Sequence, residues 1–202
     1  MASARKLLRD VAADAAACER CPLYRNATQT VFGQGPVPAP IMLVGEQPGD
    51  SEDKAGLPFV GPAGRILDRA LEEAGVVRSL VYVTNAVKHF KNVPRGKRRI
   101  HQRPIRYEIE RCRWWLDHEL RLVRPRVTVA LGTTAAWALA GRAITISQRR
   151  GQLIQFRDHV GGFVTVHPSY ILRLRDDDKD EEYRRLVADL SRVHELLPEA
   201  AK

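Results

Sequence analysis

Four short apolar segments, separated by longer stretches with helical spacing, constrain the fold of this chain more than any other feature. They are residues 40–44 (PIMLV), 80–84 (LVYVT), 127–131 (VTVAL) and 163–166 (FVTV). Each is rich in branched side chains and bounded by Gly, Pro or Asn, a pattern typical of buried strands. Residues 152–156 (QLIQF) are a weaker candidate for an edge strand.

The stretches between these segments carry apolar residues at helical spacing. Residues 63–75 place one face of apolar side chains in line, namely Ile66, Leu67, Ala70, Leu71 and Ala74, with Gly75 as a C-cap. Residues 108–123 and 133–141 follow the same pattern, and the acidic residues 175–182 suit the start of a last helix. This alternation predicts an α/β fold: a single three-layer α/β/α domain over residues 1–202, with a mostly parallel central sheet.

The 202 residues carry a formal net charge of +9, which suggests a polyanionic partner, most commonly nucleic acid. Residues 88–107 contain eight Lys or Arg residues and no acid, although charge alone also fits an ordinary solvated surface. The first 20 residues read as an amphipathic helix rather than a signal peptide, and no segment is apolar enough to span a bilayer. We therefore expect a cytoplasmic protein that does not act on membranes.

Three loops follow predicted strands, and ligands of open α/β sheets bind at the carboxyl ends of the strands. These loops are residues 45–64, 85–104 and 167–170. The first is rich in Gly and Pro but has neither the P-loop nor the dinucleotide-binding spacing. The second holds the cations and His101, and the third is HPSY.

The chain has three cysteines: Cys18 and Cys21 in CERC, and Cys112 in ERCRWW. A single C-x-x-C in a cytosolic chain fits redox, zinc or cluster chemistry, and Cys112 also fits an ordinary buried apolar cysteine.

Taken together, several motifs resemble those of the uracil-DNA glycosylase superfamily. They are GEQPG (45–49), GLPFVGPAG (56–64), VTN (83–85) and HPS (167–169). They look most like the iron–sulfur members of family 4. The loop KRRIH (97–101) resembles the UdgX branch, in which the histidine of this loop becomes covalently attached to DNA. The resemblance runs from Cys18 to the final helix.

This resemblance implies a [4Fe–4S] cluster, for which Cys18, Cys21 and Cys112 supply three ligands. His89 stands where the family 4 pattern has its fourth cysteine, and histidine can ligate cluster iron. A Cys3His set also fits structural zinc, so the donors alone leave the metal open.

The resemblance further implies roles in binding a flipped uracil. Phe59 would stack on the base, or be an ordinary core aromatic, while the Asn85 amide would match uracil and reject cytosine. Gly45 and Gln47 would complete the base pocket. His167 would donate to uracil O2 as negative charge develops there. Ser169 and Arg173 would grip the DNA backbone.

His101 is expected to attack the sugar and stay bonded to it, with Glu46 accepting the other ring proton. Its cationic neighbours, Lys97, Arg98, Arg99 and Arg103, would draw in phosphates and disfavour a protonated imidazole. The expected partner is uracil-containing DNA, preferably single-stranded, bound by a monomer. Two alternatives stay open: a turnover glycosylase whose His101 contacts only phosphate, and a non-enzymatic, metal-stapled nucleic-acid-binding module.

Overall fold

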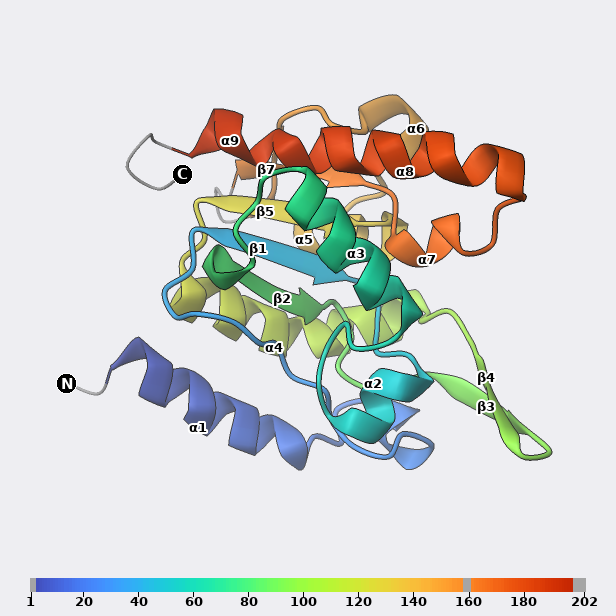
Figure 1. Cartoon of the computed structure of the whole chain (residues 1–202). Helices are drawn as coiled ribbons and strands as arrows, with labels where there is room; N and C mark the ends of the chain where they lie inside the picture. Colours follow the sequence, from blue (N-terminus) through green and yellow to red (C-terminus); the bar gives the residue numbers. More distant parts are fainter. Residues whose placement is uncertain (1–2, 158–160, 198–202) are drawn as a thin grey trace.

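The computed structural model describes residues 3–157 and 161–197 (Figure 1). Its centre is a five-stranded sheet with the order β2-β1-β5-β7-β6. The strands are β1 (Ile41–Gly45), β2 (Val81–Asn85), β5 (Val127–Leu131), β6 (Ile154–Gln155) and β7 (Gly161–Thr165). All neighbouring pairs are parallel except β6 with β7. The predicted mostly parallel α/β sheet is therefore confirmed.

The strand bounds differ slightly from the predicted ones. β1 and β2 each begin one residue later and extend to Gly45 and Asn85, which pair with each other in the register. β5 matches the prediction, β7 starts at Gly161, and the edge strand β6 is only two residues long. The extensions matter because they place Gly45 and Asn85 side by side at the carboxyl edge of the sheet.

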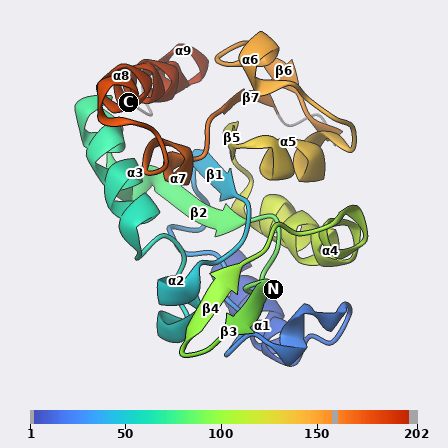
Figure 2. The ribbon, with the colours of Figure 1, turned by 90° about the vertical axis from the view of Figure 1, so that its right-hand side faces the viewer.

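Helices cover both faces of the sheet (Figures 1 and 2). The helices α1 (Ala4–Ala16), α4 (Arg106–Val123) and α5 (Thr133–Ala140) contribute to one apolar cluster, and α3 (Pro62–Glu73), α7 (Pro168–Ile171), α8 (Asp176–Ser191) and α9 (Val193–Leu196) contribute to the other. The predicted helices are confirmed, with α4 starting two residues early. Ala74, not Gly75, is the C-cap of α3, and Gly75 follows it with φ +69°.

The short helical elements of the described chain are α2 (Asp50–Ala55), α6 (Ile146–Arg149) and the 3-10 turns η1 (Pro22–Arg25) and η2 (Arg78–Leu80). None of the described helices is both long and apolar enough to cross a membrane.

The basic segment contains regular structure that the sequence did not predict. Residues 92–101 form an antiparallel hairpin of β3 (Asn92–Arg95) and β4 (Arg98–His101), which Figure 2 shows beside α2. Its turn is Gly96–Lys97, and Gly96 has φ +60°, as the first residue of a type II′ turn requires. The expectation of an irregular loop was wrong here because the strands are mostly exposed and carry three arginines, which removes the apolar alternation that marks a strand.

Candidate active site

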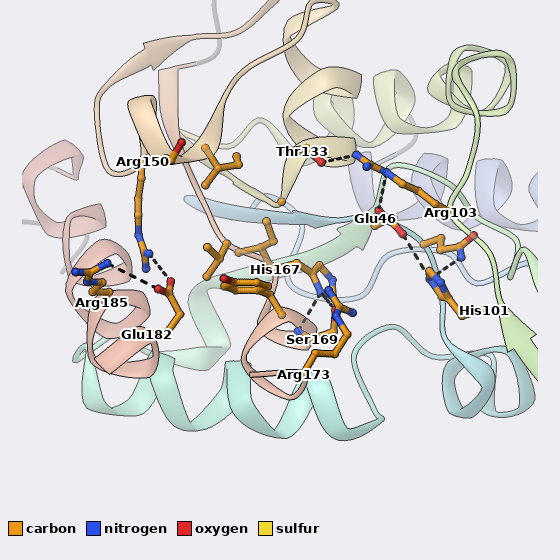
Figure 3. A pocket seen from close by; sticks show the side chains of 17 residues that line it. Glu46, His101, Arg103, Thr133, Arg150, His167, Ser169, Arg173, Glu182 and Arg185 are labelled. Atoms are coloured by element: carbon orange, nitrogen blue, oxygen red, sulfur yellow. Dashed lines mark hydrogen bonds and ion pairs between the residues drawn. The ribbon is translucent and has the colours of Figure 1, made fainter. Parts of the chain in front are cut away.

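The loops at the carboxyl edge of the sheet bring most predicted site residues together (Figure 3). Glu46 and Gln47 directly follow β1, His167 lies two residues beyond β7, and His101 ends β4. Their side chains line a cavity of about 650 Å³, together with Arg103, Ser169 and Arg173. At its far end Arg150 is held by Glu182 and Asp189.

The side chain of His101 contacts two neighbours through the same ring nitrogen. Gln47 has its amide fixed: Oε1 accepts the Lys91 backbone N–H at 3.0 Å, and Nε2 donates to the Gln102 carbonyl at 2.8 Å. The same Nε2 lies 2.8 Å from Nε2 of His101. Because an amide N–H donates, this contact favours a His101 ring whose Nε2 carries the lone pair.

Glu46 faces the same nitrogen of His101. Its Oε1 lies 3.4 Å from His101 Nε2, and its Oε2 accepts from the Thr134 hydroxyl at 2.6 Å. Burial by itself would raise the pKa of Glu46, but its contacts with His101 and the Thr134 hydroxyl outweigh burial and hold this pKa below its ordinary value. Glu46 is therefore a carboxylate at neutral pH. Glu46 thus faces Nε2 of His101, and whether it accepts the ring proton left after capture, as predicted, depends on which ring nitrogen bonds the sugar.

His167 is oriented by the turn that follows it. Its Nδ1 accepts the backbone N–H of Ser169 at 3.1 Å and lies 2.8 Å from the Ser169 hydroxyl. With Nδ1 as an acceptor, the ring proton is on Nε2. Desolvation lowers the pKa of His167 to about 4; Glu46 opposes this and Arg173 adds to it. His167 is thus a neutral donor through Nε2.

Three side chains converge on Gly45, a residue without one. A Cβ placed on Gly45 would lie 2.4 Å from Asn85 Oδ1, 2.7 Å from Phe59 Cζ and 3.4 Å from His167 Nε2. The Phe59 and His167 rings are stacked, with centroids 6.2 Å apart. Gly45, Phe59 and Asn85 do not line the 650 Å³ cavity; they form a buried group at its edge.

Backbone geometry holds two of these residues. Phe59 has φ +57°, which is uncommon for a bulky residue, and Gly64 in the first turn of α3 packs against its carbonyl, where a Cβ would come within 1.7 Å. The backbone carbonyl of Asn85 accepts a hydrogen bond of 2.7 Å from Nζ of the fully buried Lys88. Lys88 in turn pairs with Glu119, also fully buried, at 2.5 Å.

The predicted phosphate-binding cations separate into two groups. Lys97 and Arg98 lie exposed at the hairpin tip, and Arg103 extends into the cavity mouth. Arg99 instead contacts two carboxylates, Asp50 at 2.7 Å and Asp53 at 2.5 Å. Its guanidinium is committed to the protein, so it fits an anchor of the hairpin better than a phosphate contact.

Sequence reasoning missed Thr133 and Thr134, which line the site from the start of α5. The signal was present, because residues 132–134 follow the third predicted strand and so belong to the same edge of the sheet. Asp50 and Asp53 were also missed; nothing in the sequence indicates that they pair with a residue 46 to 49 positions away.

The three cysteines are buried in the same part of the apolar core. Cys18, Cys21 and Cys112 belong to the same apolar group, and Cys18 and Cys112 accept N–H groups from Trp115 and Lys88 at 3.0 and 3.1 Å. Burial raises the pKa of Cys112 to about 12 and also raises the pKa of Cys21. N–H donors beside buried sulfurs suit metal-bound thiolates.

His89 is chemically able to be a ligand. The Thr30 hydroxyl donates to the Ala15 carbonyl and therefore accepts from His89 Nε2 at 2.9 Å, which leaves Nδ1 with the lone pair. Burial lowers the pKa of His89, which keeps the ring neutral. In the described part of the chain, however, no three His, Cys, Asp or Glu side chains are close enough together to hold a metal ion. The donor set fits a cluster in its chemistry, and its spacing does not fit a single bound metal ion.

Comparisons with known proteins all match this chain to uracil-DNA glycosylases. A family model described as the uracil DNA glycosylase superfamily matches residues 32–191. The chain is 39% identical to a type-4 uracil-DNA glycosylase of Thermotoga maritima over 176 residues, 85% of this chain and 84% of the relative. Over 199 residues it is 33% identical to a type-4 enzyme of Archaeoglobus fulgidus, which covers 94% of this chain and 92% of the relative.

Proposed function

Because the chain belongs to the uracil DNA glycosylase superfamily, we propose that it excises uracil from DNA, preferably single-stranded, and captures the resulting sugar through His101. The observation that carries the first part is the convergence of Asn85, Phe59 and His167 on Gly45. An amide, an aromatic face and a neutral N–H donor are what a flipped uracil needs.

Uracil recognition and bond cleavage follow from these three groups. The side-chain amide of Asn85 pairs with N3–H and O4 of uracil, and Lys88, which donates to the backbone carbonyl of Asn85, helps to fix the position of the residue. As the bond between N1 and C1′ breaks, its electron pair stays on uracil, and the Nε2–H of His167 stabilises the charge at O2. The sugar is left as an oxocarbenium ion, beside which the Glu46 carboxylate lies as a counter-charge.

The capture step uses the nitrogen that Gln47 and Glu46 face. The lone pair of His101 Nε2 attacks C1′ and forms a bond between nitrogen and carbon, giving an imidazolium. The proton on Nδ1 then passes to solvent, since half of the His101 side chain is exposed (52%). A tethered imidazole has a large advantage over water in effective concentration. In this account Glu46 stabilises positive charge and does not receive the ring proton.

We also propose that Cys18, Cys21, His89 and Cys112 hold a [4Fe–4S] cluster, with zinc as the alternative. When bound, the metal centre would serve as a structural, redox-passive crosslink between the segment after α1 and helix α4. The three buried sulfurs and their N–H donors support this assignment.

The experiment combines a uracil assay with a denaturing gel, using single-stranded DNA that contains one uracil. Wild-type protein should release one uracil per protein and form an SDS-resistant one-to-one complex. His101→Ser should lose the complex, whereas His118→Ser, which changes a histidine of α4 that does not line the cavity, should keep it. A wild type that releases many uracils without a stable complex would show a turnover glycosylase, and DNA bound without uracil release would show a binding module.

A further inference from the structure

A second cavity lies next to the candidate active site, where α4 and α5 begin. It has a volume of about 310 Å³ and shares Arg103 and Thr133 with the main cavity. An exposed hydrogen bond of 2.5 Å from Arg103 to the Thr133 hydroxyl forms the rim between them (Figure 3). Thr134 lines the second cavity, while its hydroxyl bonds Glu46 in the first. The side chain of Thr134 therefore lies between the two cavities.

The second cavity combines an aromatic ring with cations. Trp137 of α5 is partly exposed, and the guanidinium carbon of Arg106 lies 5.1 Å from its ring centroid. Glu110 holds Arg106 in this position through an ion pair at 2.9 Å. Buried Ile109 adds an apolar wall. Among residues 3–157 and 161–197, no side chain or carbonyl accepts the indole N–H of Trp137.

We propose that this second cavity is a stacking subsite for the base of one nucleotide next to the flipped uridine. Trp137 and Arg106 supply the stacking surface, and Arg103 contacts the phosphate that crosses the rim. Aromatic rings and guanidinium planes stack on any base, because every base has a π-face, and such sites are typical of single-strand binding. A base paired in a duplex could not enter, so this subsite favours single-stranded substrate. The inference rests on the proposed function, which places the uracil base at Asn85, Phe59 and His167 beside the main cavity.

The test measures uracil release at subsaturating protein, on single-stranded DNA in which one flanking base at a time is replaced by an abasic spacer. Trp137→Leu should slow release from the unmodified strand by about 5- to 100-fold, the range expected for one lost stack. At one flanking position the spacer should slow the wild type by a similar factor and should slow Trp137→Leu no further. Trp137→Phe should retain most of the rate. The matched control is Trp114→Leu, because Trp114 also lies under an arginine, at 5.0 Å, but lines neither cavity.

A second readout covers the case in which Trp137→Leu does not fold. 2-Aminopurine at the sensitive position should lose fluorescence on binding wild-type protein and much less on binding Arg106→Gln. The subsite is wrong if spacers at every position slow wild type and Trp137→Leu by equal factors, or if 2-aminopurine responds at no flanking position. Either result would leave uracil release by the wild type intact. A wild type that releases no uracil would instead overturn the proposed function.

Discussion

At the scale of single residues, the base-recognition group depends on a residue that contributes no side chain. Asn85, Phe59 and His167 approach the position that a Gly45 side chain would occupy. Phe59 reaches this position with a left-handed backbone, and Gly64 allows α3 to pack against it. Such local strain is characteristic of functional sites and has to be offset by the surrounding packing.

Replacing Gly45 with Ala should therefore disable uracil release, at a cost in folding stability of about 1–3 kcal/mol from overpacking. The new methyl group would overlap Asn85 Oδ1 and Phe59 Cζ and displace both by about 1 Å, which can cost roughly 100-fold in rate. Gly161→Ala is the control, since a Cβ there meets nothing within 4 Å. Single-turnover uracil release from both variants checks this. Equal rates for Gly45→Ala and wild type would show that the base binds elsewhere.

The pH dependence of bond cleavage should reflect His167 and Glu46. Cleavage needs His167 neutral and Glu46 ionised; with the pKa of His167 lowered to about 4 and that of Glu46 below its ordinary value, both states persist well below neutrality. The single-turnover rate of uracil release by the wild type should thus stay level from neutral pH down to about pH 5 and fall in stronger acid. A decline centred near pH 6.5, the ordinary value for histidine, would contradict the desolvated setting of His167.

At the scale of elements, the β3–β4 hairpin positions His101, and α2 holds the hairpin. Arg99 pairs with Asp50 and Asp53, two of the three acids in the first turn of α2. Asp53 is fully buried and also accepts the backbone N–H of Thr28, so the anchor reaches into the protein interior. The hairpin therefore combines a fixed base, which carries His101, with an exposed cationic tip.

Arg99→Ala should reduce cross-linking, whereas Arg98→Ala should reduce the salt dependence of DNA binding. Losing Arg99 leaves Asp53 without its cation and loosens the hairpin, so cross-linking should fall much more than uracil release does, while the salt dependence of DNA binding stays the same. Losing Arg98 should flatten the slope of log affinity against log salt by about one unit and spare cross-linking. Measured salt slopes and cross-linking rates would separate the two, and a flattened slope for Arg99→Ala would mean that it does contact phosphate.

The elements that could be predicted from sequence are those with an apolar pattern. The four main strands and the helices α3, α4 and α5 were found within one or two residues, and the rule that sites follow strands located the loops that carry Glu46, Asn85 and His167. The hairpin could not be found, because its strands carry charge instead of alternating apolar residues. The partners of Arg99 and the Glu46 contact to His101 Nε2 depend on distances between elements, which a single sequence does not encode.

At the scale of the whole molecule, one buried network links the base pocket to the cysteines. Nζ of Lys88 binds the Asn85 carbonyl and Glu119, and its backbone N–H donates to Cys112. Both charged groups are fully buried, a state that is stable only when they are paired. A change at the cysteine group can thus reach Asn85 through a single residue.

Purified protein should be brown if the cysteines hold an iron–sulfur cluster, with broad visible absorption that Cys112→Ser abolishes. Loss of the metal should also lower the melting temperature, because the crosslink between α4 and the segment after α1 is lost. Metal analysis and thermal unfolding before and after chelation check both effects. A colourless, active protein with one zinc per chain would show that the cysteines hold zinc and not an iron–sulfur cluster.

The central claim is that His101 becomes bonded to the DNA sugar, and mass spectrometry of the cross-linked protein tests it most directly. After reaction with uracil-containing single-stranded DNA and digestion of protein and DNA, the account predicts a peptide of the β3–β4 hairpin that carries the sugar on His101, together with free uracil in equal amount. A modification on any other residue, or an unmodified His101 in a protein that has released uracil, would contradict it.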